Sequence, residues 1–183
     1  MALLLERLRR TGREIVESAE PGGSRISLRI RQVLLDPTTP ELSPITELLL
    51  YFAARAQNVD ERIRPALERG AIVVSDRFTD STFVYQGAAR GLGEDVVRQL
   101  DAIACRGVKP DLTICLDIDL ATSAQRASRR DRLEEEPDAF RERVREAYHR
   151  LAEREPARMR LIDASGTPEQ VAELVWQAVA SHV

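Results

Sequence analysis

One stretch of the sequence, Ile72-Val73-Val74-Ser75-Asp76-Arg77-Phe78-Thr79-Asp80-Ser81-Thr82-Phe83-Val84-Tyr85-Gln86, joins a short apolar run to hydroxyl, aromatic and amide side chains. The apolar run follows Gly70 and is typical of a buried strand in a parallel sheet. The polar residues therefore come at the carboxyl end of that strand, where open α/β sheets hold their ligands. The carboxylate of Asp76 suits a metal ion or its water, and the planar guanidinium of Arg77 suits a phosphate. A site of this kind usually has a glycine-rich loop as well, and the sequence contains none.

The bulk composition indicates one globular domain. The chain has 183 residues, of which 43% are hydrophobic and 31% charged, and this length is enough to bury a sizeable core. A net charge of −3 is too small to argue for nucleic acid or an anionic membrane as a partner. No apolar run approaches the ~20 residues of a membrane span. Cys105 and Cys115 lack CxxC spacing and are typical of buried free thiols, so we expect a cytoplasmic protein.

The order of apolar patterns predicts strands that alternate with helices, and hence a parallel sheet with right-handed crossovers. Strands are expected over 14–16, 71–75, 112–117 and 160–163. Helices are expected from about 3 to a stop at 12, over 26–34, from 43 to about 69 with a bend at Pro65, over 94–105, after 117 to about 130, from 138, and after a capping box at 167–170. The sequence shows no repeats and no domain linker.

Three candidate sites each have a functional and a structural interpretation. Asp76 and Arg77 bind a ligand or form a surface ion pair, and the polar residues that follow them favour the ligand. Tyr51 and Arg55 lie one helical turn apart, either as a ring packed on an arginine stem or as a ring that stacks on a nucleobase while Arg55 donates to it. The charged segment 126–136 is a solvated helix end or a lid whose arginines hold polyphosphate.

Five motifs occur in an order that closely resembles bacterial thymidylate kinase (dTMP kinase) from Met1 to the C-terminus. They are Glu20-Pro21-Gly22-Gly23, the segment 47–57, the segment 76–87, Pro110-Asp111-Leu112-Thr113 and Asp131-Arg132-Leu133-Glu134. The resemblance implies one α/β domain of the P-loop NTPase type, a nucleotide kinase with helices on both faces of a parallel sheet. It also implies transfer of the ATP γ-phosphoryl group to dTMP to give dTDP, with Mg²⁺, in a homodimer.

The resemblance assigns roles to residues at matching positions. Tyr51 would stack on thymine and Arg55 would donate to its exocyclic oxygen, while Arg77 would hold the acceptor phosphate. Asp76 would order Mg²⁺, mostly through water. The other implied substrate contacts are Pro21 in the glycine turn, Ser81 and Thr82 near the thymine imide edge, Gln86 close by, and Tyr85 at the sugar 2′ position. The implied lid spans 126–137, and its catalytic residues are Arg126, Arg129, Arg130, Arg132 and Glu134.

Two departures from the family pattern bear on activity. Ala19 stands where family members usually carry arginine, which removes one possible phosphate contact. The family also opens with a strand and a GxxxxGK[ST] loop, and the family register puts Met1 directly after that loop. With the family's opening strand counted as strand 1, the implied order in the sheet is 2-3-1-4-5. The missing strand is therefore the central one, and the strands at 71–75 and 112–116 would flank its empty position.

An empty slot leaves ladder groups unpaired, at a cost that should exceed the ~5–15 kcal/mol by which domains are stable. We therefore expect that Met1 is an internal methionine chosen as a start codon. Residues 1–183 alone should be nearly inactive, and roughly two dozen upstream residues should restore activity. Two alternatives remain open. One is a non-catalytic paralogue that binds dTMP and ignores ATP, as a regulatory or hetero-oligomer subunit; the other is a deoxynucleoside kinase.

Overall fold

The computed structural model describes residues 1–36, 38, 42–126 and 136–183. The strands are β1 (Ile15–Ala19), β2 (Ile72–Asp76), β3 (Thr113–Asp117) and β4 (Met159–Asp163). The helices are α1 (Ala2–Arg9), α2 (Arg25–Leu35), α3 (Pro44–Asn58), α4 (Arg64–Glu68), α5 (Thr79–Thr82), α6 (Glu94–Cys105), α7 (Leu120–Arg126), α8 (Asp138–Arg154) and α9 (Pro168–Val179). Two π-helical segments, η1 (Val59–Ile63) and η2 (Phe83–Ala89), continue α3 and α5, and a short 3₁₀ turn, η3 (Ala180–His182), follows α9.

The strands form two parallel pairs. β1 pairs with β2, in a register that sets Ala19 opposite Asp76. β3 pairs with β4 and sets Asp117 opposite Asp163. Among the described residues, β2 and β3 belong to different two-stranded sheets. The predicted strands and their parallel direction are confirmed.

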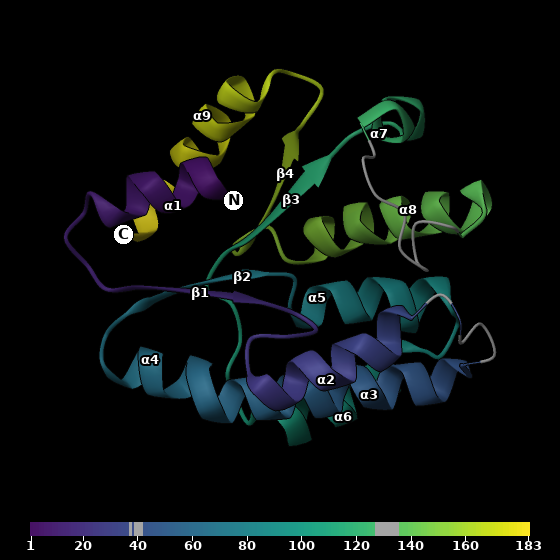
Figure 1. The fold of residues 1–183 in the computed structure, drawn as a ribbon. Helices are drawn as coiled ribbons and strands as arrows, with labels where there is room; N and C mark the ends of the chain where they lie inside the picture. Colours follow the sequence, from purple (N-terminus) through teal and green to yellow (C-terminus); the bar gives the residue numbers. More distant parts are fainter. Residues whose placement is uncertain (37, 39–41, 127–135) are drawn as a thin grey trace.

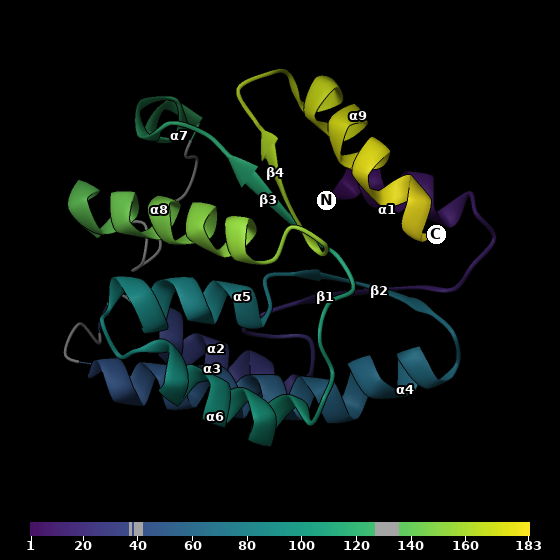
Figure 2. The same cartoon turned by 180° about the vertical axis from the view of Figure 1, so that it is seen from behind.

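Helices cover both faces of the β1–β2 pair (Figure 1). α1 and α9 lie together on one side, near both chain termini, and α2, α3, α4 and α6 lie on the other (Figures 1 and 2). Alternate residues of β2 point to the two layers: Val73 packs against the α3–α6 cluster, whereas Ile72 and Val74 pack against the cluster of α1 and α9. Burial on both faces explains the uninterrupted apolar run of this strand.

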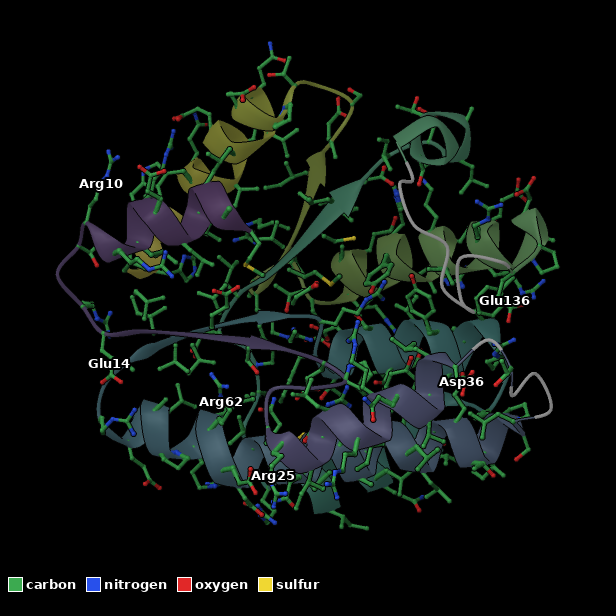
Figure 3. All side chains as sticks on the ribbon, viewed as in Figure 1. Arg10, Glu14, Arg25, Asp36, Arg62 and Glu136 are labelled. Carbon is green, nitrogen blue, oxygen red and sulfur yellow. The ribbon has the colours of Figure 1, made fainter. Side chains whose placement is uncertain are left out.

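Several helix boundaries follow from capping residues in the sequence. Ser43 accepts a hydrogen bond from the Thr46 amide, and Pro44 occupies the first turn of α3. Thr167 and Gln170 form the predicted capping box at the start of α9. Charged side chains at the surface, such as Arg10 and Arg25, point away from the core (Figure 3).

The structure corrects three details of the predicted helices. The irregularity in the long helix lies at η1, Val59–Ile63, ahead of the expected bend at Pro65. Proline lacks an N–H and its ring clashes with the carbonyl four residues earlier, so a wider turn before it relieves the clash. The first helix ends at Arg9, before the expected stop at Gly12. The helical segment of α5 and η2, over 79–89, was not predicted.

Some apolar side chains of these helices are exposed. On α2, Leu34 is buried but Ile26 and Val33 are 43% and 48% exposed, and on α9 Leu174 is 43% exposed. Cys105 is buried and Cys115 half-buried, and both are free thiols. Among the described helices, none combines the length and the apolar character that crossing a membrane requires.

Candidate functional site

The carboxyl ends of β1 and β2 bring two of the sequence motifs together. The Glu20 amide, just past β1, donates to the Asp76 carbonyl at the end of β2, at 2.9 Å. Arg77 follows with a φ of +67°, in the left-handed region that non-glycine residues rarely adopt. Such strain persists only where the surrounding structure imposes it, and it clusters at functional sites.

A cavity opens at this edge of the sheet. Its lining residues come from the end of β1, from α3, and from the segment that follows β2: Glu20, Tyr51, Arg55, Arg77, Phe78, Ser81, Thr82, Tyr85 and Gln86. Seven of these are residues that the sequence predicted, and they derive from segments that lie far apart in the chain. Pro21 and Asp76 are not among the lining residues. Pro21 is buried beside Glu20 and its carbonyl accepts from Arg31 at 2.8 Å, while Asp76 is exposed at the strand end.

Arg55 is an almost fully buried side chain of the cavity wall, with 2% of its surface exposed. Its Nε donates to Glu20 Oε2 at 2.5 Å and its Nη2 donates to Thr82 Oγ1 at 2.9 Å. The rings of Phe52 and Phe78 lie 4.9 and 5.2 Å from the guanidinium carbon. Nη1 is buried and has no hydrogen-bond partner among the described residues. This side chain therefore presents one unused donor in a fixed position.

Glu20 lines the cavity, but its side chain was not among the predicted site residues, although it begins the Glu-Pro-Gly-Gly turn. It is buried, and its Oε1 accepts from Asn58 Nδ2 at 3.1 Å. Asn58 also donates to Ser18 at 3.0 Å. The sequence did contain a signal for Glu20: it is an acidic residue directly after a strand. That position lies at the edge of the sheet where α/β proteins bind their ligands.

Arg77 and Tyr85 contact each other across the cavity. The guanidinium carbon of Arg77 lies 4.9 Å from the centre of the Tyr85 ring. Behind them, the Ser81 hydroxyl lies 2.9 Å from the hydroxyl of Tyr148 on α8. The free volume is only about 20 Å³, far below the ~300–1,000 Å³ of typical ligand sites. A larger molecule must displace one of these side chains.

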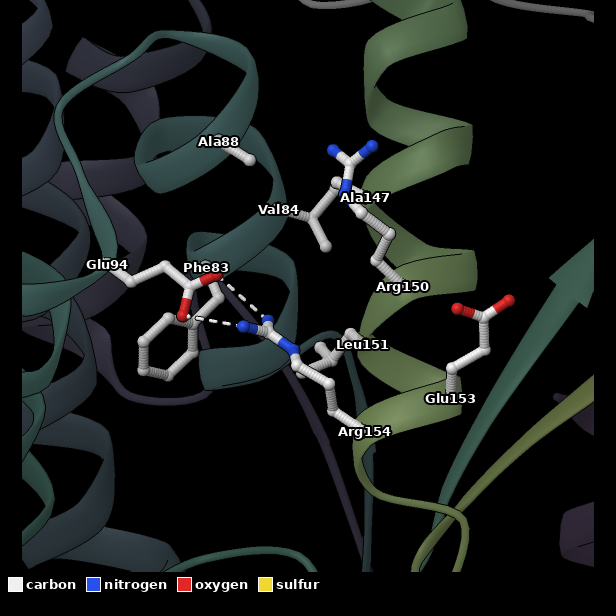
Figure 4. A pocket seen from close by; sticks show the side chains of 9 residues that line it. All are labelled: Phe83, Val84, Ala88, Glu94, Ala147, Arg150, Leu151, Glu153 and Arg154. Atoms are coloured by element: carbon white, nitrogen blue, oxygen red, sulfur yellow. Dashed lines mark hydrogen bonds and ion pairs between the residues drawn. The ribbon is translucent and has the colours of Figure 1, made fainter.

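A second cavity of about 280 Å³ lies between η2, the start of α6, and α8 (Figure 4). None of the predicted site residues that the structure describes lines it. Arg154 donates twice to Glu94, at 2.8 and 3.0 Å, while Arg150 and Glu153 extend away from each other. Size alone would favour this cavity, but the arrangement of functional groups favours the smaller one.

The remaining predicted residues belong to the lid and the metal site. Arg129, Arg130, Arg132 and Glu134, and the side chain of Arg126, lie outside the described residues. Within the described residues, no group of three or more histidine, cysteine or acidic side chains is arranged to hold a metal ion. Asp76 supplies one exposed carboxylate, which fits Mg²⁺ because that ion commonly keeps several waters and one or two carboxylates.

Comparison with known proteins identifies the family. A family model described as "Thymidylate kinase" matches residues 1–175. A thymidylate kinase of Pelobacter propionicus is 45% identical over 191 residues, covering 100% of this chain and 87% of that protein. One from Thermomicrobium roseum is 48% identical over 182 residues, covering 97% and 86%. The crystal structure of thymidylate kinase from Ehrlichia chaffeensis superimposes with a TM-score of 0.80 at 26% identity, covering 97% of this chain and 89% of that one. The fold, the site and these relatives together show that the chain belongs to the thymidylate kinase family of phosphate-transferring enzymes.

Proposed function

We propose that this protein is a dTMP kinase that uses ATP and binds dTMP in the cavity at the ends of β1 and β2. The observation that carries the proposal is the convergence of Tyr51, Arg55, Arg77 and Tyr85 on one cavity. These side chains supply a stacking ring, a fixed donor and a phosphate-binding cation. That combination is complementary to a pyrimidine nucleotide.

The base end of the ligand is assigned to Arg55 and Tyr51. The buried Nη1 of Arg55 lacks a partner among the described residues, and a thymine carbonyl oxygen would satisfy it. Glu20 and Thr82 hold the other guanidinium nitrogens, so the donor cannot turn away. We propose that Tyr51, one helical turn earlier on α3, stacks on the base.

The phosphate end is assigned to Arg77. Its guanidinium is stacked on Tyr85, and that contact is weaker than a bidentate hydrogen bond to phosphate. We propose that the dTMP phosphate draws Arg77 away from the ring. This movement would enlarge the cavity and leave Tyr85 free to contact the sugar.

In the reaction, an oxygen of the dTMP phosphate attacks the γ-phosphorus of ATP, and the bond from that phosphorus to the leaving oxygen of ADP breaks. Catalysis consists of positioning and charge neutralisation. Here Arg77 holds the attacking phosphate and Arg55 fixes the base. Bound Mg²⁺ would neutralise charge on the phosphates, with Asp76 as the carboxylate that holds it or its water. The lid, 126–137, and its arginines remain a prediction.

Residues 1–183 contain no GxxxxGK[ST] sequence. We propose that a polypeptide of these residues alone binds dTMP but transfers phosphate far below the ~1–100 per second of ordinary kinases. A folded sample that reached such rates would contradict this. The free thiols support a reducing compartment, such as the cytoplasm.

Calorimetric titration with dTMP and with thymidine tests the site. Arg77→Ala should weaken dTMP binding at least tenfold and leave thymidine binding nearly unchanged, because only dTMP carries the phosphate. Arg55→Lys should weaken the binding of both ligands, because an ammonium group cannot replace the planar guanidinium. Arg98→Ala, at an exposed arginine of α6, is the matched control and should change neither.

Three outcomes would overturn the assignment. A folded wild-type chain that binds neither ligand would refute the assignment of the site. Unchanged affinity of Arg55→Lys for the ligands would refute the contact between Arg55 and the base. Phosphorylation of thymidine but not dTMP, measured by chromatography of the products, would identify a deoxynucleoside kinase instead. Binding of dTMP without any turnover, even with upstream residues present, would identify a non-catalytic paralogue.

A further inference from the structure

Gln86, which lines the cavity, is held from behind by a buried carboxylate. Its Nε2 donates to Glu47 Oε1 at 2.8 Å, and both residues are at most 2% exposed. Because the amide nitrogen is the donor and a carboxyl oxygen is the acceptor, this contact fixes which end of the Gln86 amide faces Glu47. The position of the Glu47 carboxylate therefore decides how Gln86 meets a ligand.

Arg90 lies on the other side of Glu47 and connects it to the start of α8. Its Nε lies 3.5 Å from Glu47 Oε1, and its Nη2 lies 2.5 Å from Glu136 Oε1. Its guanidinium also stacks on the ring of Phe140, at 4.8 Å. Burial lowers the pKa of Arg90, but Glu136 and Glu47 outweigh it and leave that pKa above its usual range. Arg90 is therefore charged and bound to two carboxylates.

The same part of α8 supports Tyr85. The rings of Tyr85 and Phe140 lie 6.2 Å apart and are tilted by 59°. The backbone amide of Arg90 donates to the Tyr85 carbonyl at 2.9 Å, at the end of η2. Arg90 does not line the cavity itself. It contacts two residues that do touch the cavity wall: Glu47, which binds Gln86, and Phe140, which packs on Tyr85.

We propose that Arg90 is a positioning residue for nucleotide binding: it holds Glu47 and Phe140 in the places from which they orient Gln86 and Tyr85. The inference rests on the proposed function, because it assigns Gln86 and Tyr85 to the dTMP site. The half-buried Glu136, beside the first turn of α8 (Figure 3), anchors the far end of this network. Nucleotide affinity should therefore depend on a residue that does not touch the nucleotide.

The central test compares Arg90→Gln with Arg98→Gln. Arg98 is a matched control, since it also pairs with a glutamate, Glu94, and lies 5.6 Å over an aromatic ring, that of Phe83, away from the cavity. Arg90→Gln should weaken dTMP binding about tenfold in calorimetry, the effect of losing one charge-assisted contact. Arg98→Gln should bind like the wild type. Equal dTMP affinities in the two variants would overturn the inference.

A second variant separates positioning from general loss of stability. In Glu47→Gln/Arg90→Gln the amide oxygen at position 47 can still accept from Gln86 and no buried carboxylate is left without its arginine. This double variant should recover most of the dTMP affinity that Arg90→Gln loses. If it binds dTMP as weakly as Arg90→Gln, the contact through Glu47 is not what matters, and the inference is wrong.

A measurement without nucleotide keeps the inference distinct from the proposed function. The side-chain amide protons of Gln86, assigned in the NMR spectrum by their absence in Gln86→Leu, should exchange slowly with water in the wild type. Exchange should be faster in Arg90→Gln and unchanged in Arg98→Gln. Unchanged exchange in Arg90→Gln refutes the positioning role. Faster exchange in a protein that fails to bind dTMP refutes only the proposed function.

Discussion

At the scale of single residues, Gly23 is where the glycine turn meets the site. Its φ is +85°, and an added Cβ would lie 2.0 Å from Oδ1 of the buried Asn58, which holds Glu20. Gly12 has a similar φ of +77°, but apart from its chain neighbours no heavy atom of the described residues lies within 4 Å of an added Cβ. We expect Gly12→Ala to cost about 1–2 kcal/mol of stability from backbone strain alone, and Gly23→Ala to cost clearly more. Urea unfolding of both variants measures the difference, and equal losses would contradict the close approach.

Asp117, at the end of β3, predicts a pH dependence of stability. The hydrogen bond from Arg145 lowers its pKa to about 2 against burial, which raises it, and a contact with His149 adds to the lowering. A depressed pKa stabilises the fold above the unfolded value of about 3.9, and the effect is lost as the pH falls towards 2. In urea unfolding, the stability advantage of wild type over Asp117→Asn should shrink as the pH falls below about 4. A pH-independent advantage would refute the assignment.

At the scale of elements, the segment of α5 and η2 carries four of the nine residues that line the cavity, and an ion pair with the buried Asp80 holds it in place. Arg158 donates twice to Asp80 of α5, at 2.7 and 2.8 Å, and Thr113 of β3 donates to the same carboxylate at 2.7 Å. Asp80 is 5% exposed. Removing Arg158 would leave this buried charge without its main cation.

Arg158→Met should therefore lower the free energy of unfolding by about 3 kcal/mol, and Asp80→Asn/Arg158→Met should recover much of that loss. Chemical denaturation gives both values. Arg69→Met, which breaks an exposed pair with Glu14, serves as the control and should change stability little. A double variant as unstable as Arg158→Met would show that the charge is not the cause.

At the scale of the whole molecule, we propose that the protein is a homodimer that uses the layer of α2, α3 and α6. These helices lie together on one side of the molecule (Figures 1 and 2). Together they carry half of the large exposed apolar side chains among the described residues: Ile26, Leu28, Val33, Ile45, Leu49, Val96 and Ile103. Large exposed apolar surfaces often mark interfaces. A second copy, as the family resemblance implies, would cover them.

Sedimentation velocity tests the dimer with two substitutions of similar exposure. Leu49 on α3 is 49% exposed and Leu174 on α9 is 43% exposed. Leu49→Glu should shift the protein to monomer because a charge in an apolar interface is costly. Leu174→Glu should leave the dimer intact. A monomeric wild type, or dissociation by Leu174→Glu alone, would contradict the assigned face.

Local patterns sufficed to predict much of this protein. Apolar runs marked each strand, and capping residues such as Ser43 and Thr167 marked helix starts, because both signals act within a few residues. Seven cavity residues were predicted because their motifs follow strand ends or share one helix face, as Tyr51 and Arg55 do. Resemblance to a family then supplied their roles.

The tertiary structure alone decided which groups face one another. Arg55 meets Glu20 across 35 residues of sequence and Arg158 meets Asp80 across 78. Spacing along the chain could not predict that Arg90 stacks on Phe140. Nor could it predict that Ile26 and Val33 of α2 are exposed. The physical reason is that periodicity fixes which side of an element a residue occupies, whereas its partner depends on how distant elements pack together.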